Sequence, residues 1–347
     1  MTVLVRSVWL RLLLCFVLLA ACSCSDEAVP GTDTRLRLTV VTPISGLGDM
    51  GYNDKIMSGI MEFYGHHDVN MTLVSPTSLD EIRQIIQDWR KNTESGPRSL
   101  LLLTDDVYES VLKNTGITLA SGQQILLVES RSTDLPEGVY TFNINRYGIS
   151  YLAGCMARKH QEACVIAAMS GNPVLEEAID GYTEGYQTDN DKQVKVFYLA
   201  EDASGFNMPD SAYRVIGQMG NTFVLPLAGG SNNGIYKYSR ETPFYLSLVI
   251  GMDTDCSWFS SRIPFSIVIH IDTLLVQYLT AWFEEREMEP SHTYGMDSGM
   301  VDIVMSPIFY KYIDIWEEYY NDIEYWNNTY RKYKDEALEK EKTYVMH

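Results

Sequence analysis

The sequence predicts an α/β fold with two lobes, each a parallel sheet flanked by helices. Apolar runs of strand length alternate with amphipathic stretches of helical length along most of the 347 residues, a pattern typical of parallel sheets covered by helices. Residues 100–103 are leucine throughout, which favours a strand buried on both faces. The alternation occurs twice, so we expect a ligand cleft between two similar halves, at the carboxyl ends of the strands.

The first residues predict a leader that is not part of the fold. Arg6 and Arg11 flank the start of an apolar segment, 12–21, that is too short to span a membrane as a stable helix. The segment leads into Leu-Ala-Ala-Cys, ending at Cys22. This resembles a bacterial lipobox, in which the cysteine becomes the lipid-modified first residue. A plain signal peptide is the alternative. Residues 22–35 are mostly small and polar and predict a flexible tether.

Folded elements follow the tether in a regular order. In the first half we expect strands at 36–44, 71–76, 99–105 and 124–130, with helices at 53–65, 79–91 and 106–114. In the second half we expect helices at 148–159 and 174–188, with strands at 163–171, 194–202, 221–230 and 246–255. Residues 308–330 repeat aromatic residues and isoleucine at helical spacing. A packed aromatic helix is therefore expected there, followed by a charged segment that is a solvated helical end or a tail.

The charge and the cysteines argue against several classes of function. A formal net charge of −19 repels phosphate backbones, so no nucleic-acid partner is expected. No pair of cysteines downstream of the leader has C-x-x-C spacing, which argues against a zinc or thioredoxin-like site. Cys155 and Cys164 predict either a disulfide in an exported protein or two buried thiols.

A glycine-rich loop after the first strand raises the question of a dinucleotide cofactor. Gly46, Gly48 and Gly51 match G-x-G-x-x-G, but the second strand ends at 74–77 without the acidic residue that would hold a ribose. Asp49 lies inside the loop, where its carboxylate would repel a pyrophosphate. We therefore expect no cofactor and a ligand that offers hydroxyl, amine or amide donors. No catalytic or metal-binding motif occurs in the sequence, so an enzyme is not expected.

Several segments, in order along residues 36–306, resemble the BMP family of substrate-binding lipoproteins. They are GLGDMGYNDKIMSGI (46–60), VYTFNINRYGISYLAGCMA (139–157), SGNPVLEEAIDGYTEGYQ (170–187), VLPLAGGSNNGIY (224–236), and VIGMDTD (249–255) with PFSIVIHIDTLL (264–275). The resemblance implies a type I periplasmic-binding fold with three hinge crossings and a nucleoside in the cleft. It also implies a first lobe of residues 36–146 and 266–290 and a second lobe of 147–265 and 291–307, followed by the aromatic helix and tail at 308–347.

The resemblance further implies a set of ligand-binding residues. They are Asp49, Tyr52, Asn53, Glu129, Phe206, Gly229, Gly230, Asp253 and His270. Carboxylates accept hydrogen bonds from vicinal hydroxyls, aromatic faces stack on a base, and glycines admit close approach of the backbone. Capping of the next helix is the alternative role for Asp49 and Asn53, and loop packing is the alternative for Tyr52 and Phe206. His270 stands where the family has a lysine, and as an imidazolium it would replace that charge.

Together these features predict an exported solute-binding protein that is anchored through Cys22 to a membrane of the bacterial cell envelope. Its expected ligand is a nucleoside-like small molecule, and its expected partner is a membrane permease. The alternative is an interaction or sensory lipoprotein that keeps the fold without small-ligand transport. The replaced lysine and the aromatic C-terminal helix are the basis for that alternative.

Overall fold

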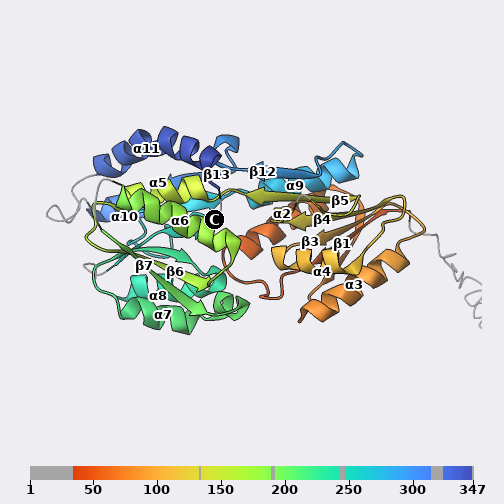
Figure 1. Ribbon diagram of the computed structural model, residues 1–347, viewed down its shortest axis with the longest axis horizontal. Helices are drawn as coiled ribbons and strands as arrows, with labels where there is room; N and C mark the ends of the chain where they lie inside the picture. Colours follow the sequence, from red (N-terminus) through yellow and green to blue (C-terminus); the bar gives the residue numbers. More distant parts are fainter. Residues whose placement is uncertain (1–33, 133, 189–191, 243–246, 314–322, 346–347) are drawn as a thin grey trace, which may run out of the picture. The chain divides into compact units, whose positions relative to one another are not determined.

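The computed structural model describes residues 34–132, 134–188, 192–242, 247–313 and 323–345 (Figure 1). It confirms the predicted α/β fold with parallel sheets flanked by helices. The described strands form a six-stranded sheet in the order β12-β5-β4-β3-β1-β2, a four-stranded sheet in the order β7-β6-β8-β9, and a three-stranded sheet in the order β10-β11-β13. Among these strands, all neighbours are parallel except β11 and β13.

The middle strands of the six-stranded sheet are buried on both faces. Its strands are β1 (Leu36–Val41), β2 (Val69–Val74), β3 (Ser99–Leu103), β4 (Gln123–Val128), β5 (Val139–Ile144) and β12 (Ser291–Tyr294). The helices around it are α2 (Tyr52–His66), α3 (Leu79–Asn92), α4 (Glu109–Thr115) and α9 (Ile271–Phe283). Leu100 and Leu102 lie in the core shared with α2 and α9, and Leu101 and Leu103 lie in the core shared with α3 and α4. Successive side chains of a strand alternate between its faces, so burial on both sides requires this unbroken apolar run.

The four-stranded sheet lies at the centre of the second half. Its strands are β6 (Ala163–Met169), β7 (Val194–Ala200), β8 (Phe223–Leu227) and β9 (Leu248–Val249). Helices α5 (Tyr147–Ala157) and α6 (Pro173–Gln187) cover one face, and α7 (Pro209–Gly217) and α8 (Asn232–Glu241) cover the other (Figure 1). α5 is buried along its whole length. It lies very close to α6, because a Cβ on Gly185 would collide with the carbonyl oxygen of Tyr151.

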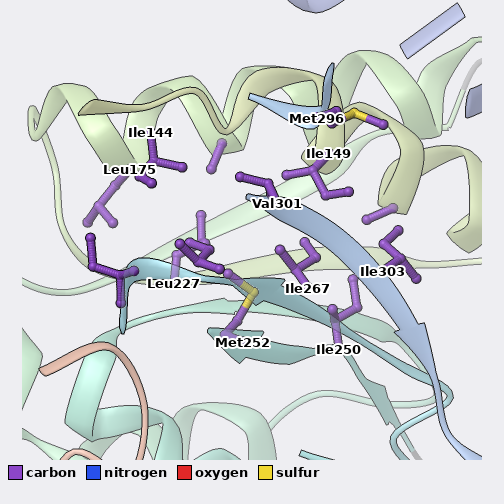
Figure 2. Close-up of a cluster of buried hydrophobic side chains, with 14 of the residues drawn as sticks. Ile144, Ile149, Leu175, Leu227, Ile250, Met252, Ile267, Met296, Val301 and Ile303 are labelled. Carbon is purple, nitrogen blue, oxygen red and sulfur yellow. The ribbon is translucent and has the colours of Figure 1, made fainter. Parts of the chain in front are cut away.

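The single strand expected over 246–255 is split into two. β9 ends at Val249, and β10 (Gly251–Asp253) pairs instead with β11 (Phe265–Ile269). β11 also pairs with β13 (Val301–Met305). Figure 2 shows Ile267, Val301 and Ile303 of this three-stranded sheet near Ile149 of α5 in the same buried cluster. The split lets Asp253 end a strand that belongs to a different sheet from β8 and β9.

The chain passes three times between the six-stranded sheet with its helices and the elements of the second half. The passages run from β5 to α5, from β11 to α9 and from β12 to β13. Strand pairing differs from the expected lobe boundaries in two places. Residues 266–269, expected in the first lobe, belong to β11, which pairs with β10 and β13. Residues 291–294, expected in the second lobe, pair with β5. β12 reads SHTY and alternates exposed with half-buried residues, so it carries no apolar pattern that the sequence could reveal. The division into two lobes itself stays a prediction.

The aromatic C-terminal region is helical where the structure describes it. It contains α10 (Pro307–Ile313) and α11 (Ile323–Thr343), and α11 continues through the charged end that was expected to be solvated. The ring of Trp326, a buried side chain, lies 5.7 Å from that of Phe223. Cys155 and Cys164 are buried thiols, the second of the two expected alternatives. In the described residues, no helix is both long enough and apolar enough to span a bilayer.

Candidate functional site

The candidate site lies where the carboxyl ends of several strands meet. Asp49 follows β1, Glu129 follows β4, and Asp253 ends β10. Short distances connect loops of the two halves: a Cβ on Gly51 would lie 3.3 Å from Oδ2 of Asp253, and Nδ2 of Asn233 donates a 3.4 Å hydrogen bond to the backbone oxygen of Asp49. Residues predicted from distant segments are therefore brought together.

Asp49 caps the first turn of α2. Its carboxylate accepts hydrogen bonds from the backbone N–H groups of Gly51 and Asn53, both at 2.9 Å, and of Asp54 at 3.2 Å. Asn53 turns its side-chain amide toward its own loop and donates to the carbonyl oxygen of Gly46 at 3.0 Å. Asp49 therefore has the capping role considered from the sequence, whereas Asn53 does not cap α2 and instead braces the loop. A carboxylate with three bonds still has acceptor capacity for a ligand donor.

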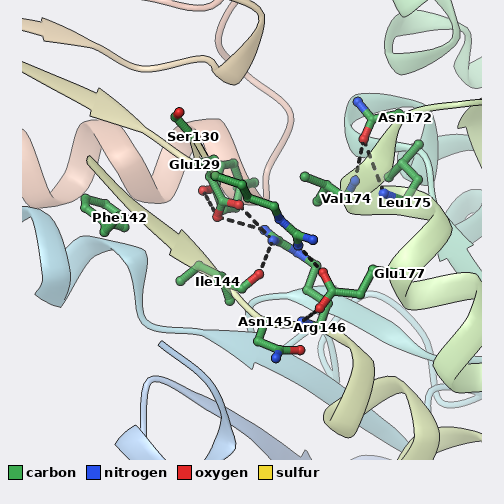
Figure 3. A network of polar contacts seen from close by, with 12 residues as sticks. Glu129, Ser130, Phe142, Ile144, Asn145, Arg146, Asn172, Val174, Leu175 and Glu177 are labelled. Atoms are coloured by element: carbon green, nitrogen blue, oxygen red, sulfur yellow. Dashed lines mark hydrogen bonds and ion pairs between the residues drawn. The ribbon is translucent and has the colours of Figure 1, made fainter. Parts of the chain in front are cut away.

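Glu129 lies in a buried polar network (Figure 3). Arg146 forms a bidentate ion pair with it, Nη1 to Oε2 at 2.9 Å and Nη2 to Oε1 at 3.0 Å, and the Tyr52 hydroxyl donates to Oε1 at 2.7 Å. Glu129 and Arg146 are only 7% and 9% exposed. Burial, reinforced by the Glu129 charge, raises the pKa of Tyr52 well above its usual value, so the hydroxyl keeps its proton. Because both Glu129 oxygens are engaged, this residue positions Tyr52 and Arg146.

The same network extends to α6 through Glu177. The backbone N–H of Arg146 donates to Oε1 of Glu177 at 3.2 Å, and Arg131 forms an ion pair with the other oxygen (Figure 3). Sequence reasoning missed Arg146. The available signal was a cation two residues after the strand VYTFNI, because a charge buried at the end of such a strand needs a buried partner.

Asp253 differs from Glu129 because, in the described part of the chain, no hydrogen-bond donor contacts its carboxylate. Burial and then the nearby charge of Asp49 raise the pKa of Asp253 to about 7, although Arg146 and Lys55 act in the opposite sense. Its φ of +68° is also unusual for a residue other than glycine. A partly buried acid without a donor is suited to accept hydrogen bonds from hydroxyl or amine groups of a ligand.

Two further acids near the site were not predicted. Asp105 follows β3 and accepts a 3.2 Å hydrogen bond from the N–H of Val107, and Asp106 hydrogen-bonds to the Asp105 side chain. Burial and then the Asp105 charge raise the pKa of Asp106 to about 7. The charges of Glu129 and Arg146 also act on Asp106, so it lies near their ion pair. The sequence signal was T-D-D directly after the four leucines of the third strand, at the edge of a parallel sheet where ligands bind.

Phe206 and the paired glycines form the part of the site that comes from the second half. Phe206 lies in a short turn after β7, and Gly229, with a φ of +52°, follows β8. A Cβ on Gly229 would lie 3.0 Å from the Phe206 ring, and a Cβ on Gly230 would lie 3.6 Å from Cβ of Asp49. The absence of side chains at both glycines therefore lets the loops after β1, β7 and β8 meet.

His270 lies at the start of α9, where its backbone N–H donates to the carbonyl oxygen of Met300 at 2.9 Å. Lys55 of α2 reaches the same turn. Its Nζ donates to the carbonyl oxygen of Ile269 at 2.9 Å and lies 3.4 Å from Oδ1 of Asp272. A lysine charge is thus present beside this turn, although it comes from α2 and not from position 270.

Two other expectations concern a metal and the lipid. Among the described residues, no group of three histidines, cysteines or acids is arranged to hold a metal ion. Cys22, the expected lipidation site, lies outside the residues that the structure describes.

Comparison with known families gives one match that covers most of the chain. The family model Bmp, described as ABC transporter substrate-binding protein PnrA-like, matches residues 37–329. Among curated proteins, none has a matching sequence.

Several solved structures share the fold. A solute-binding protein of an ABC transporter system from Aeropyrum pernix K1 has a TM-score of 0.71 at 16% identity, covering 88% of this chain and 90% of that chain. An ABC transporter solute-binding protein from Burkholderia graminis C4D1M, solved with D-arabinose, has a TM-score of 0.57 at 16% identity, covering 79% and 97%. A transcriptional activator of the comK gene from Bacillus halodurans has a TM-score of 0.58 at 18% identity, covering 83% and 98%. At these identities the likeness shows the fold alone.

Proposed function

Because the chain belongs to the Bmp family of PnrA-like ABC transporter substrate-binding proteins, we propose that it captures a nucleoside-like molecule for uptake by a membrane permease. The observation that carries this proposal is the carboxylate of Asp253, which is partly buried, lies beside the glycine loop and lacks a hydrogen-bond donor from the described chain. Leaving a buried acceptor unpaired is costly. A ligand with hydroxyl or amine groups would remove that cost.

The surroundings of Asp253 support a ligand that has both a polar and an aromatic part. Asp49 and Asp106 add carboxyl groups, which suit the hydroxyls of a ribose. Tyr52 and Phe206 add aromatic rings from the two halves of the chain, which suit stacking on a base. Tyr52 is held in place by its hydrogen bond to Glu129. The site therefore has acceptors and aromatic surface in the combination that a nucleoside would use.

A thermal-shift screen followed by calorimetry tests the proposal. The screen contains purine and pyrimidine nucleosides, free bases, ribose and D-arabinose. We expect nucleosides to raise the melting temperature, and Asp253→Asn to abolish most of the shift. Asp210→Asn, an exposed acid on α7, is the matched control and keeps the shift. A shift with sugars alone would replace the nucleoside by a sugar. No shift with any compound would favour the interaction or sensory role.

We also propose that Cys22 carries a lipid that anchors the protein to the cell envelope. The support is the Leu-Ala-Ala-Cys sequence after a short apolar segment, followed by a polar tether. Cys22→Ser should leave the protein unprocessed or release it from the membrane fraction, while Cys24→Ser, two residues further on, should not. If Cys22→Ser is processed normally and still sediments with membranes, the lipid anchor is wrong.

A further inference from the structure

The carboxylate of Glu341, near the end of α11, contacts two segments that are far apart in sequence. Its Oε1 accepts a 2.9 Å hydrogen bond from the backbone N–H of Met296. A Cβ on Gly295 would collide with the same oxygen, and a Cβ on Gly148 would lie 2.7 Å from Oε2. Glu341 is 7% exposed, and burial raises the pKa of its carboxyl to about 7. The side chain therefore fits between two backbones that come close only because both positions are glycine.

Both of these segments are passages between the halves of the chain. Gly148 lies in the first turn of α5, just after the passage from β5. Gly295 and Met296 begin the passage from β12 to β13. The two passages are also bonded to each other, because the N–H of Asn145 donates to the carbonyl oxygen of Tyr294 at 2.8 Å. Figure 1 shows α11 beside α5, with its C-terminal end near β13.

Neighbouring residues fasten the end of α11 to α5 and α6. The ring of Tyr344 stacks on that of Tyr147 with centroids 4.1 Å apart, and its hydroxyl donates to Asp180 at 2.8 Å. Lys340 pairs with Glu184 of α6. Glu341 is thus held by a helix that is fixed to the second half, while its carboxylate reaches the passage that leaves β12.

This contact lies close to the candidate site along the chain. Arg146, which binds Glu129 and thereby the network around Tyr52, precedes Gly148 by two residues. We propose that the end of α11 is a strap across two of the three passages, and that Glu341 thereby positions the ligand site in the arrangement described above. The effect on affinity rests on the proposed ligand-binding function, whereas the restraint on the passages does not.

Hydrogen exchange and calorimetry on the full chain test the strap. In the ligand-free protein, Glu341→Ala should speed exchange of two amides at least about tenfold: that of Met296, which loses its acceptor, and that of Asn145, which joins the two passages. Glu341→Gln keeps an acceptor for Met296 and should retain most of the protection. Glu339→Ala removes an exposed partner of Lys342 on the same helix and should change nothing. With a ligand from the screen, Glu341→Ala should weaken affinity about tenfold.

Two results would overturn the strap. One is unchanged exchange at both amides in folded Glu341→Ala. The other is weakened affinity without faster exchange, because the effect would then not act through the passages. If Glu341→Ala does not fold, Tyr344→Ala provides the test at the half-buried end of the helix. It should give a smaller increase in exchange at the same amides, and unchanged exchange would refute the strap. If no ligand is found, the function proposal fails while the exchange experiment still decides the strap.

Discussion

At the scale of single residues, the backbone marks the site as clearly as the side chains do. Four residues other than glycine have positive φ in the described chain, and three of them, Met50, Glu129 and Asp253, lie at the site. Each such conformation costs of order 1 kcal/mol or more for a residue with a Cβ. At Glu129 the ion pair with Arg146 offsets the cost of this backbone conformation. In the described chain, Asp253 has no ion pair or hydrogen bond that offsets the strain of its backbone. Without a ligand, its buried carboxylate therefore stays without a hydrogen-bond donor.

Asp253→Asn should therefore have opposite effects on binding and on stability. Ligand affinity should fall by roughly 2–4 kcal/mol, because a charged acceptor is lost. Since the folded-state pKa of about 7 is raised, the acid destabilises the fold as pH rises from about 4 through 7, and the amide removes this loss. Thermal unfolding at pH 5 and pH 8 checks the sign: the variant should gain more stability relative to the parent protein at pH 8 than at pH 5. Equal stability changes at both pH values, with unchanged affinity, would show that Asp253 has no binding role.

Arg146→Gln should be strongly destabilising even without ligand. The substitution leaves Glu129 buried with only the Tyr52 hydroxyl as a side-chain donor, and removing one partner of a buried pair typically costs roughly 3–5 kcal/mol. Replacing both residues, as Glu129→Gln with Arg146→Gln, should recover part of that loss because no unpaired charge remains. Urea unfolding of the two single variants and the double variant measures the coupling. A loss below about 1 kcal/mol in Arg146→Gln would mean that water replaces the arginine.

At the scale of single residues, the sequence revealed site residues that belong to a local motif. It did not reveal residues whose role depends on contact with a side chain from a distant segment. Asp49, Tyr52 and Asp253 follow strands at positions that the fold class makes functional. Arg146 and Asp106 also follow strands, but their roles depend on side chains from other strands, and no local pattern specifies such a pairing. The predicted role of Glu129 changed for the same reason, because its acceptors are already used by Tyr52 and Arg146.

At the scale of elements, α5 and α6 pack so closely that their backbones are in contact. Gly154 of α5 and Gly181 and Gly185 of α6 each face backbone atoms of the other helix. The sequence predicted both helices correctly, since their apolar periodicity is local. It did not predict that the end of α11 would be fixed to them. Glu341 lies in the charged run EKEKT, which resembles a solvated helix end until its partners across the chain are known.

Gly185→Ala tests the contact between α5 and α6. The added methyl would collide with the carbonyl oxygen of Tyr151, so the helices must separate, and we expect a loss of roughly 2–4 kcal/mol. Gly65→Ala is the matched control in α2, because a Cβ there meets nothing within 4 Å. It should stabilise by roughly 0.5–1 kcal/mol through helix propensity. Denaturant midpoints measure the stability of both variants. Equal midpoints for Gly185→Ala and Gly65→Ala would show that α5 and α6 tolerate a wider spacing.

At the scale of the whole molecule, the net charge of −19 and the acids of the site act in the same direction. The cations nearest Asp253 are already paired, Arg146 with Glu129 and Lys55 with Asp272. The topology follows from the alternation of strands and helices. The alternation does not predict to which sheet β11 and β12 belong, because that depends on where the chain crosses between the two halves.

A nucleoside 5′-monophosphate should therefore bind at least about tenfold more weakly than its nucleoside, because the added anion meets like charge in a partly buried site. Calorimetry with both ligands at low and high salt measures the difference. The difference in affinity should become smaller at high salt, because salt screens the long-range repulsion between the phosphate and the acidic protein. Equal or tighter binding of the monophosphate would indicate an unpaired cation at the site and would contradict the charge assignment.

The strap also has a consequence for the order of folding. α11 follows every strand in chain order, and β12 pairs with β5 across about 150 residues of intervening chain. Contacts this distant in sequence form late, because their loop-closure entropy is lost before the contacts are made. We therefore expect the passages beside Gly148 and Gly295 to be fastened only after all three sheets have formed. Until then, we expect the two passages to stay unrestrained by Glu341, so that the proposed binding geometry is completed late in folding.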